Sequence, residues 1–280
     1  MPSKTEEGVP EPVNEGISKA WLHAQRSKFG ACALDLPFKR AAAITPRKAA
    51  GTTSAVASLP ANVKAKLTAL NDPTVVCLAS LHALLQRYTS PNDGLYGVQG
   101  SDGPASICYL GASDETTSLS SLQAECDAAL RVARPHASNC IALAGHMNGS
   151  MPRPMVHLTV SDDRPFKGTK DKAGQGILLV VDVSLRDGTI TVTWDPLCLE
   201  SSYIEKTPDH LLPLIASLCT DAPGGALATD YLSAAERQLL VRDCNQTEAP
   251  VPPGCTHNFL TAAAAESPAH PAVIYGDQTW

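Results

Sequence analysis

Histidine and cysteine are the residues of this chain with the widest chemical range, and their spacing decides whether they could act together. The chain carries eight histidines and nine cysteines. No histidine is followed four residues later by aspartate, so an H-x-x-x-D motif is absent. His136, His146 and His157 are well separated, and a fold could bring Cys126 or Cys140 beside one of them as a nucleophile–base pair. The alternative is that the thiols pack in the interior and the histidines are surface or strand residues, and on that interpretation we predict no catalytic residue.

Sites for metals, phosphates and covalent carriers need local patterns that this sequence lacks. No two cysteines form a C-x-x-C pair, whereas zinc ligands normally come in tight local pairs. There is no G-x-S-x-G turn for a serine nucleophile and no G-x-x-x-x-G-K phosphate loop. Gly224–Leu227 has the glycines of a carrier-protein attachment site, but Leu227 stands where the serine that bears phosphopantetheine would have to be. We therefore predict no metal site and no cofactor site in this chain.

Composition narrows the function classes further. The 280 residues are 44% hydrophobic and 18% charged with a net charge of −6, which is typical of a globular protein and does not favour nucleic-acid binding. The longest strongly apolar run, Ile177 to Val183, is too short to cross a bilayer, and the first residues contain no apolar signal segment. We expect a cytoplasmic protein with reduced thiols and no membrane or nucleic-acid partner. Residues 1–14 are rich in Pro and Glu and predict a disordered tail.

The elements that would have to position any site predict an α/β (α+β) fold with a mixed sheet flanked by helices. Apolar residues recur at helical spacing in several segments, and the Asp-Gly within Arg186–Gly188 separates two apolar runs as in a β-hairpin. The predicted helices are residues 17–28, 60–70, 73–88, 118–132, 202–219 and 233–241. The predicted strands are residues 55–59, 95–99, 106–110, 155–160, 177–185 and 189–194.

The last fifty residues resemble the junction between two domains of nonribosomal peptide synthetases. The segment Leu232–Leu240 (LSAAERQLL) and the segment Asn245–Pro250 (NQTEAP) resemble the short helix, W-N-x-T motif and proline-rich connector that follow condensation domains. Cys244 replaces the usual tryptophan. Thr256–Phe259 and Ala272–Asp277 are similar to the opening helix and strand of an adenylation domain.

The preceding residues resemble the C-terminal lobe of a condensation domain. Trp21 and the segment Leu34–Pro37 are similar to the Y-W … L-E-L-P entry into that lobe, and Leu95–Val98 to a strand that follows two paired helices. The resemblance implies a chloramphenicol-acetyltransferase-like lobe with four parts. These are a tail at 1–14, a truncated condensation-like domain at 15–230, a linker at 231–255, and the first helix and strand of an adenylation domain at 256–280.

Departures from the family pattern determine the expected function. The catalytic H-H-x-x-x-D-G motif is absent, and Gln99–Gly103 stands where a turn usually carries an arginine. The G-x-F-x-N-T and H-Q-D-x-P-F-E segments are not recognisable between 104 and 150. The resemblance therefore implies a non-catalytic N-terminal region of a fungal-type peptide synthetase in secondary metabolism. It would be a docking platform for an adenylation domain in the same chain, within a parent enzyme that uses ATP, Mg²⁺ and phosphopantetheine.

Two other functions stay open from the sequence. The chain could be a residual acyltransferase completed by a second lobe in trans, with His136, His146 or His157 as general base. It could also be a docking module for a carrier protein.

Overall fold

A computed structural model provides the architecture. It describes residues 20–21, 36, 52–89, 93–101, 103–113, 117–137, 155–162, 177–220, 229–250 and 254–280. The predicted tail at 1–14, most of the predicted helix at 17–28, Cys140, His146 and Leu227 lie outside these residues. The chain divides into two compact units, residues 1–233, here called the body, and residues 234–280, here called the C-terminal unit.

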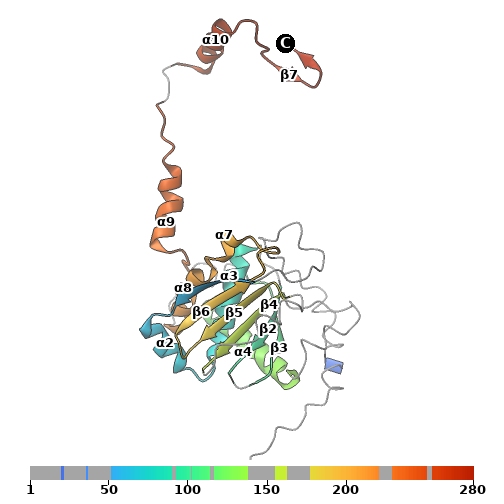
Figure 1. Ribbon diagram of the computed structural model, residues 1–280, viewed down its shortest axis with the longest axis vertical. Coiled ribbons are helices and arrows are strands. Elements are labelled where there is room, and N and C mark those ends of the chain that lie inside the picture. Colours follow the sequence, from blue (N-terminus) through green and yellow to red (C-terminus); the bar gives the residue numbers. More distant parts are fainter. Residues whose placement is uncertain are drawn as a thin grey trace, which may run out of the picture. The chain divides into compact units, whose positions relative to one another are not determined.

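The body combines strands and helices in the order that the sequence predicts (Figure 1). Its strands are β1 (Thr53–Ser58), β2 (Gly94–Gln99), β3 (Ser106–Leu110), β4 (Val156–Ser161), β5 (Leu179–Ser184) and β6 (Thr189–Trp194). Its helices are α2 (Ala61–Thr68), α3 (Pro73–Tyr88), α4 (Leu119–Ala133), the 3₁₀ turn η2 (Arg134–His136), α7 (Ser201–Ile204) and α8 (Thr207–Cys219). The predicted helix at 202–219 is thus two helices, and Pro208 lies in the first turn of the second, where proline is tolerated.

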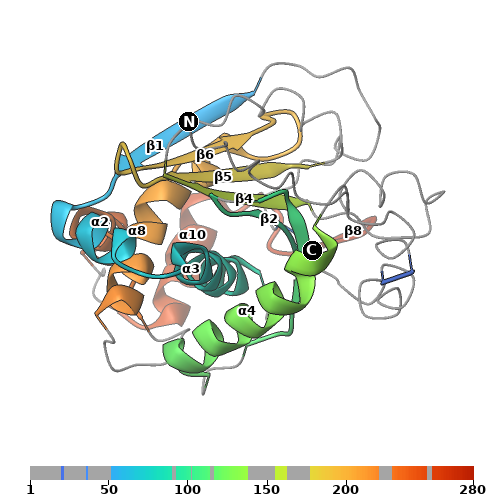
Figure 2. The ribbon, with the colours of Figure 1, turned by 90° about the horizontal axis from the view of Figure 1, so that it is seen from below.

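The six strands form one mixed sheet in the order β1-β6-β5-β4-β2-β3. β2, β4 and β5 run parallel to one another, whereas the β1–β6, β5–β6 and β2–β3 pairs are antiparallel. Figure 2 shows α2, α3, α4 and α8 together on one face of this sheet. The mixed α/β fold class is therefore confirmed, and in the described part the flanking helices form a single layer.

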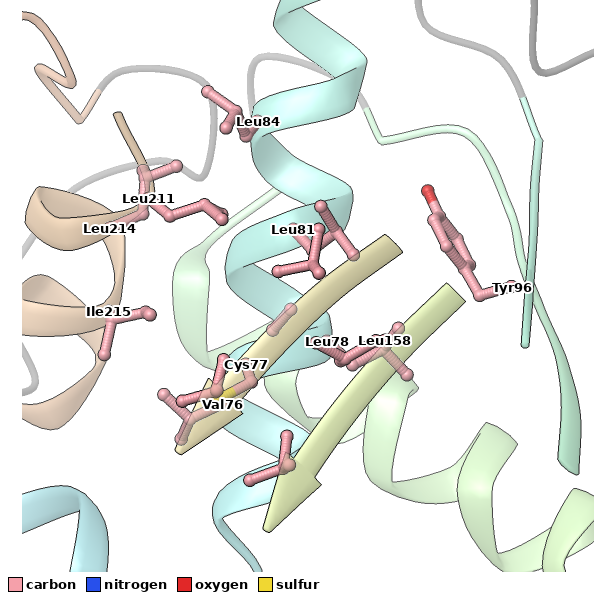
Figure 3. Packing of buried hydrophobic residues seen from close by; sticks show 14 of the residues in the cluster. Val76, Cys77, Leu78, Leu81, Leu84, Tyr96, Leu158, Leu211, Leu214 and Ile215 are labelled. Atoms are coloured by element: carbon pink, nitrogen blue, oxygen red, sulfur yellow. The ribbon is translucent and has the colours of Figure 1, made fainter. Parts of the chain in front are cut away.

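Helix α3 is the centre of the body. Its sequence is apolar on nearly all sides, and 13 of its 16 residues are buried between the sheet, α4 and α8. Asp72 caps its N-terminus by accepting a hydrogen bond from the Thr74 backbone N–H at 3.1 Å, and Pro73 occupies the first turn. In Figure 3, Leu211, Leu214 and Ile215 project from α8 towards α3, against which α8 packs.

The β5–β6 hairpin confirms the turn predicted from Arg186–Gly188. Gly188 has a φ of 67°, which a residue with a side chain rarely adopts. The turn is fixed to the body from outside, because the Lys64 ammonium donates to the Arg186 carbonyl at 2.6 Å and the Leu59 N–H donates to the Gly188 carbonyl at 2.8 Å.

The C-terminal unit contains helices and a small hairpin without a buried core. Its elements are α9 (Ala234–Val241), the 3₁₀ turn η4 (Asp243–Asn245), α10 (Thr256–Glu266), β7 (Ile274–Tyr275) and β8 (Gln278–Thr279). None of its described residues is buried. Where the sequence predicts one strand after α10, the structure has two short antiparallel strands joined at Gly276, whose φ is 58°.

Candidate functional site

The sheet separates two of the residues that could have formed a nucleophile–base pair. Along β4, Val156, Leu158 and Val160 belong to the core on the helix side, so His157 points to the opposite face, where it is fully buried. Cys126 lies on α4 in the helix-side core. Cys126 and His157 therefore cannot meet.

The buried thiols are poor nucleophiles. Burial raises the pKa of Cys108 to about 12, against a smaller opposing effect of the Arg134 charge, and raises the pKa of Cys126 well above its usual range. A thiol that stays protonated neither attacks a carbonyl nor binds a metal readily. In the part of the chain that the structure describes, no three His, Cys, Asp or Glu side chains converge so as to hold a metal ion.

His136 packs as an aromatic residue. It lies in η2, and its ring stacks on Trp21 with 4.7 Å between the ring centroids and an interplanar angle of 12°. This contact joins the segment that resembles the family's entry motif to the end of α4. Of the three candidate bases, the structure thus places His136 in a stacking contact and His157 in the interior, and His146 lies outside the described residues.

His82 is a histidine that the sequence reasoning did not single out. It is fully buried on α3, where Nδ1 lies 2.8 Å from the Tyr96 hydroxyl and Nε2 lies 3.0 Å from the Gly111 carbonyl oxygen. Both bonds are satisfied when the neutral ring donates from Nε2 and accepts at Nδ1. Burial lowers the pKa of His82 to about 4, so the ring is neutral at pH 7. The available signal was an ionisable residue in the middle of a helix that is apolar on nearly all sides.

A pocket of about 560 Å³ opens at the carboxyl ends of β2 and β4, where ligands bind in many open α/β sheets. Its charged groups include the Asp72–Arg134 ion pair at 2.6 Å. The pocket lies at the turn where the family pattern usually has an arginine. The arginine near this turn comes from η2 instead, since a Cβ added to Gly100 would lie 3.9 Å from the Arg134 guanidinium. Its described lining contains no histidine or cysteine, so it brings together none of the candidate nucleophiles and bases.

The C-terminal unit presents a different kind of candidate site, an exposed apolar surface. In α10, Phe259 and Leu260 are 43% and 68% exposed. In the hairpin, Ile274, Tyr275 and Trp280 are 56 to 78% exposed together with Val273. The helix nevertheless has a defined start, because the Cys255 N–H donates to the Asn258 side chain at 2.9 Å. Defined local structure with uncovered apolar residues is the pattern of a surface that a partner covers.

Sequence comparisons give no match, either to a protein-family model or to a curated protein. Comparison of the structure does: the body shares its fold with part of the condensation-type domains of nonribosomal peptide synthetases. The helices of the described residues include none that is long and apolar enough to span a membrane.

Three solved structures illustrate the likeness. The X-domain from teicoplanin biosynthesis aligns with a TM-score of 0.56 and 16% identity over 80% of this chain. The cyclization-docking bidomain of EpoB from Sorangium cellulosum aligns with a TM-score of 0.57 and 13% identity over 77% of this chain. The peptide synthetase FmoA3, bound to AMPPNP, aligns with a TM-score of 0.58 and 16% identity over 98% of this chain. The chain spans 58%, 50% and 32% of these three structures, respectively.

Proposed function

We propose that this chain is a non-catalytic, condensation-like region of a nonribosomal peptide synthetase that serves as a structural platform for an adjoining adenylation domain. The observation that carries the proposal is a condensation-type fold in which the described residues assemble no acid–base site. The H-H-x-x-x-D-G motif is absent from the sequence, and the described candidates His136 and His157 are held in a stacking contact and in the interior. Proton transfer requires a base within hydrogen-bonding reach of the reacting amine.

The body has the properties of a platform. Its core is continuous from α2 across α3 to α8 and the sheet, and it includes large side chains without solvent exposure such as Tyr96, Leu78 and Leu81. A close-packed core of this kind resists deformation and can present a constant surface to a neighbour. Interfaces between domains of one chain typically bury roughly 600–1,500 Å², which is enough to restrict the motion of a partner.

In this proposal the C-terminal unit is the transition into the neighbour. Residues 231–255 are the linker, and residues 256–280 are the first helix and hairpin of the adenylation domain, whose remaining parts cover the exposed side chains of α10 and of the hairpin. The alignment with FmoA3 supports this assignment, because it covers 98% of the chain, whereas the alignments with the X-domain and the EpoB bidomain cover 80% and 77%. ATP, Mg²⁺ and phosphopantetheine then act elsewhere in a cytoplasmic parent enzyme of secondary metabolism.

The test is deletion of residues 1–230 from the parent enzyme. We expect a lower melting temperature or solubility of the adenylation domain, with unchanged amino-acid preference in ATP–pyrophosphate exchange. Deletion of residues 1–14 alone is the matched control and should change neither. An altered amino-acid preference, or thioester-dependent amide formation by the isolated chain that is lost on replacing His136, His146 or His157, would contradict the platform role.

A further inference from the structure

Tyr231, the last aromatic residue before α9, lies among three side chains of the body. Its ring centroid is 5.0 Å from that of His210 and 6.4 Å from that of Tyr88, with interplanar angles of 74° and 71°. Both are edge-to-face geometries, which aromatic pairs favour. The Arg87 guanidinium carbon lies 4.9 Å from the centre of the Tyr231 ring, within the range of a cation–π contact. Tyr231 thus has attractive neighbours on three sides.

The three side chains come from the rigid centre of the body. Arg87 and Tyr88 form the last turn of α3, and His210 lies in the first turns of α8. The Tyr88 hydroxyl and His210 Nδ1 are 2.5 Å apart, so this hydrogen bond joins the two helices through two of the residues that contact Tyr231. Because α3 and α8 pack against each other through the main core, they hold Arg87, Tyr88 and His210 in place around Tyr231.

The contacts of Tyr231 have a consequence for α9, because Tyr231 lies just before α9 in the chain. The body ends at Ser233 and α9 begins at Ala234, three residues after Tyr231. With the ring held, the start of α9 lies within about 10 Å of a fixed point, given at most about 3.5 Å per residue. The next element upstream that the structure describes is α8, which ends at Cys219, and a tether from there to Ala234 could reach about 50 Å.

We infer that Arg87, Tyr88 and His210 form a docking site for Tyr231, and that this intramolecular contact fixes the point at which the connector leaves the body. The site is an aromatic- and cation-lined receptor whose ligand is the chain's own tyrosine. The inference stands on contacts within the body, so it holds whether or not the neighbouring domain is an adenylation domain.

Simple packing would give Tyr231 a different signature. It is only partly buried and lies at the margin of the core, so a packing role alone affects unfolding slightly and leaves the exit of the connector unchanged. Docking predicts that removing the Tyr231 ring strongly changes where the connector leaves the body and only slightly changes the unfolding of the body. The experiment therefore measures the exit of the connector in variants whose body stays folded.

The test is a pulsed electron-paramagnetic-resonance distance measurement on the full chain. One spin label replaces exposed Val132 on α4 and the other replaces exposed Leu239 on α9, both as non-natural amino acids so that the native cysteines stay. We expect Tyr231→Ala to broaden the distance distribution clearly, whereas Tyr231→Phe, which keeps the ring, leaves it unchanged. Tyr203→Ala, which removes an exposed tyrosine from α7, is the matched control and should also leave it unchanged. Amide exchange at residues 229–233 should become about tenfold faster in Tyr231→Ala, because several aromatic contacts are lost together.

An unchanged distribution in Tyr231→Ala, with the body folded, overturns the inference. If Tyr231→Ala does not fold, Arg87→Met decides, since it removes the cation and keeps most of the volume. Broadening in Arg87→Met supports the docking site, and an unchanged distribution rejects it.

Discussion

Helices α3 and α10 are both rich in apolar residues and both begin with a defined cap, yet they differ in what surrounds them. Asp72 caps α3, and 13 of its 16 residues are buried. The start of α10 is fixed in a different way, because the side chain of Asn258, inside the first turn, accepts from the backbone N–H of the N-cap residue Cys255; none of the α10 residues is buried. Local sequence is sufficient to start a helix in either unit, but only the body supplies the tertiary contacts from which most helix stability derives. The four predictions below test this difference.

The largest expected effect is a cavity in α3. Leu81→Ala removes a side chain without solvent exposure, and it should lower the free energy of unfolding of the body by about 2–5 kcal/mol. Leu260→Ala makes the same chemical change in α10, at a side chain that is 68% exposed, and should cost less than about 0.5 kcal/mol. Urea unfolding measures both, followed by the fluorescence of Trp194, which is buried in the body, and by helical circular dichroism for α10. Equal losses would mean that the two helices are equally supported.

The next effect depends on pH and is carried by His82. Its pKa is about 4 in the folded body, below the ordinary 6.5, so the unfolded chain binds more protons between these values. Stability is fully present above about pH 6.5 and falls as the pH drops towards 4, by about 3 kcal/mol in total. In His82→Gln, the side chain can still donate to Gly111 and accept from Tyr96 but cannot titrate, so this part of the pH dependence should disappear.

The control for that experiment lies in the other unit. His257→Gln changes an exposed histidine of α10 and should leave the pH dependence of unfolding as it is. Chemical unfolding at several pH values between 4 and 8 provides the comparison. A pH profile of His82→Gln that matches the parent profile would show that His82 does not carry this loss of stability.

A smaller effect is expected at the two helix caps. Asp72→Ala removes both the hydrogen bond to Thr74 and the ion pair with Arg134, so it should lower the stability of the body by about 1–2 kcal/mol. Arg134→Met removes only the partly exposed ion pair and should cost less than about 1 kcal/mol. Asn258→Ala should reduce the helical circular dichroism while leaving the unfolding of the body unchanged. A body destabilised by Asn258→Ala would contradict the separation of the two units.

The smallest effect is expected from removing the C-terminal unit. A chain that ends at Ser233 keeps the complete core, so its melting temperature should lie within about 2 °C of the parent value. Differential scanning calorimetry measures this directly. A much lower melting temperature would show that residues 234–280 stabilise the body.

Much of the secondary structure follows from the sequence because its causes are local. The predicted strand at 106–110 and the predicted helix at 73–88 have the observed bounds, and the Asp-Gly turn places the β5–β6 hairpin. These elements follow from apolar periodicity, a proline at a helix start and a glycine with positive φ.

The arrangement of the elements and the local surroundings of the candidate residues could not be predicted in the same way. β2 pairs with β4 although α4 lies between them in the sequence, and no local pattern encodes that choice. Tyr231 meets Tyr88 and Arg87 only after the core has formed, so nothing within its own segment indicates the contact. The burial of His157 could not be predicted from its segment either. The alternating sequence of its strand, β4, is typical of a half-exposed sheet, but β4 is buried on both faces.

The place of β1 at the edge of the sheet has a consequence for synthesis of the chain. Its described partner is β6, with Thr53 opposite Trp194, so a growing chain must extend past residue 194 before β1 can pair. Until then β1, whose sequence TSAVAS is uncharged and contains no proline, is without its partner strand. Contacts between residues far apart in the sequence form slowly, and we therefore expect β1 to be among the last strands of the body to pair during synthesis.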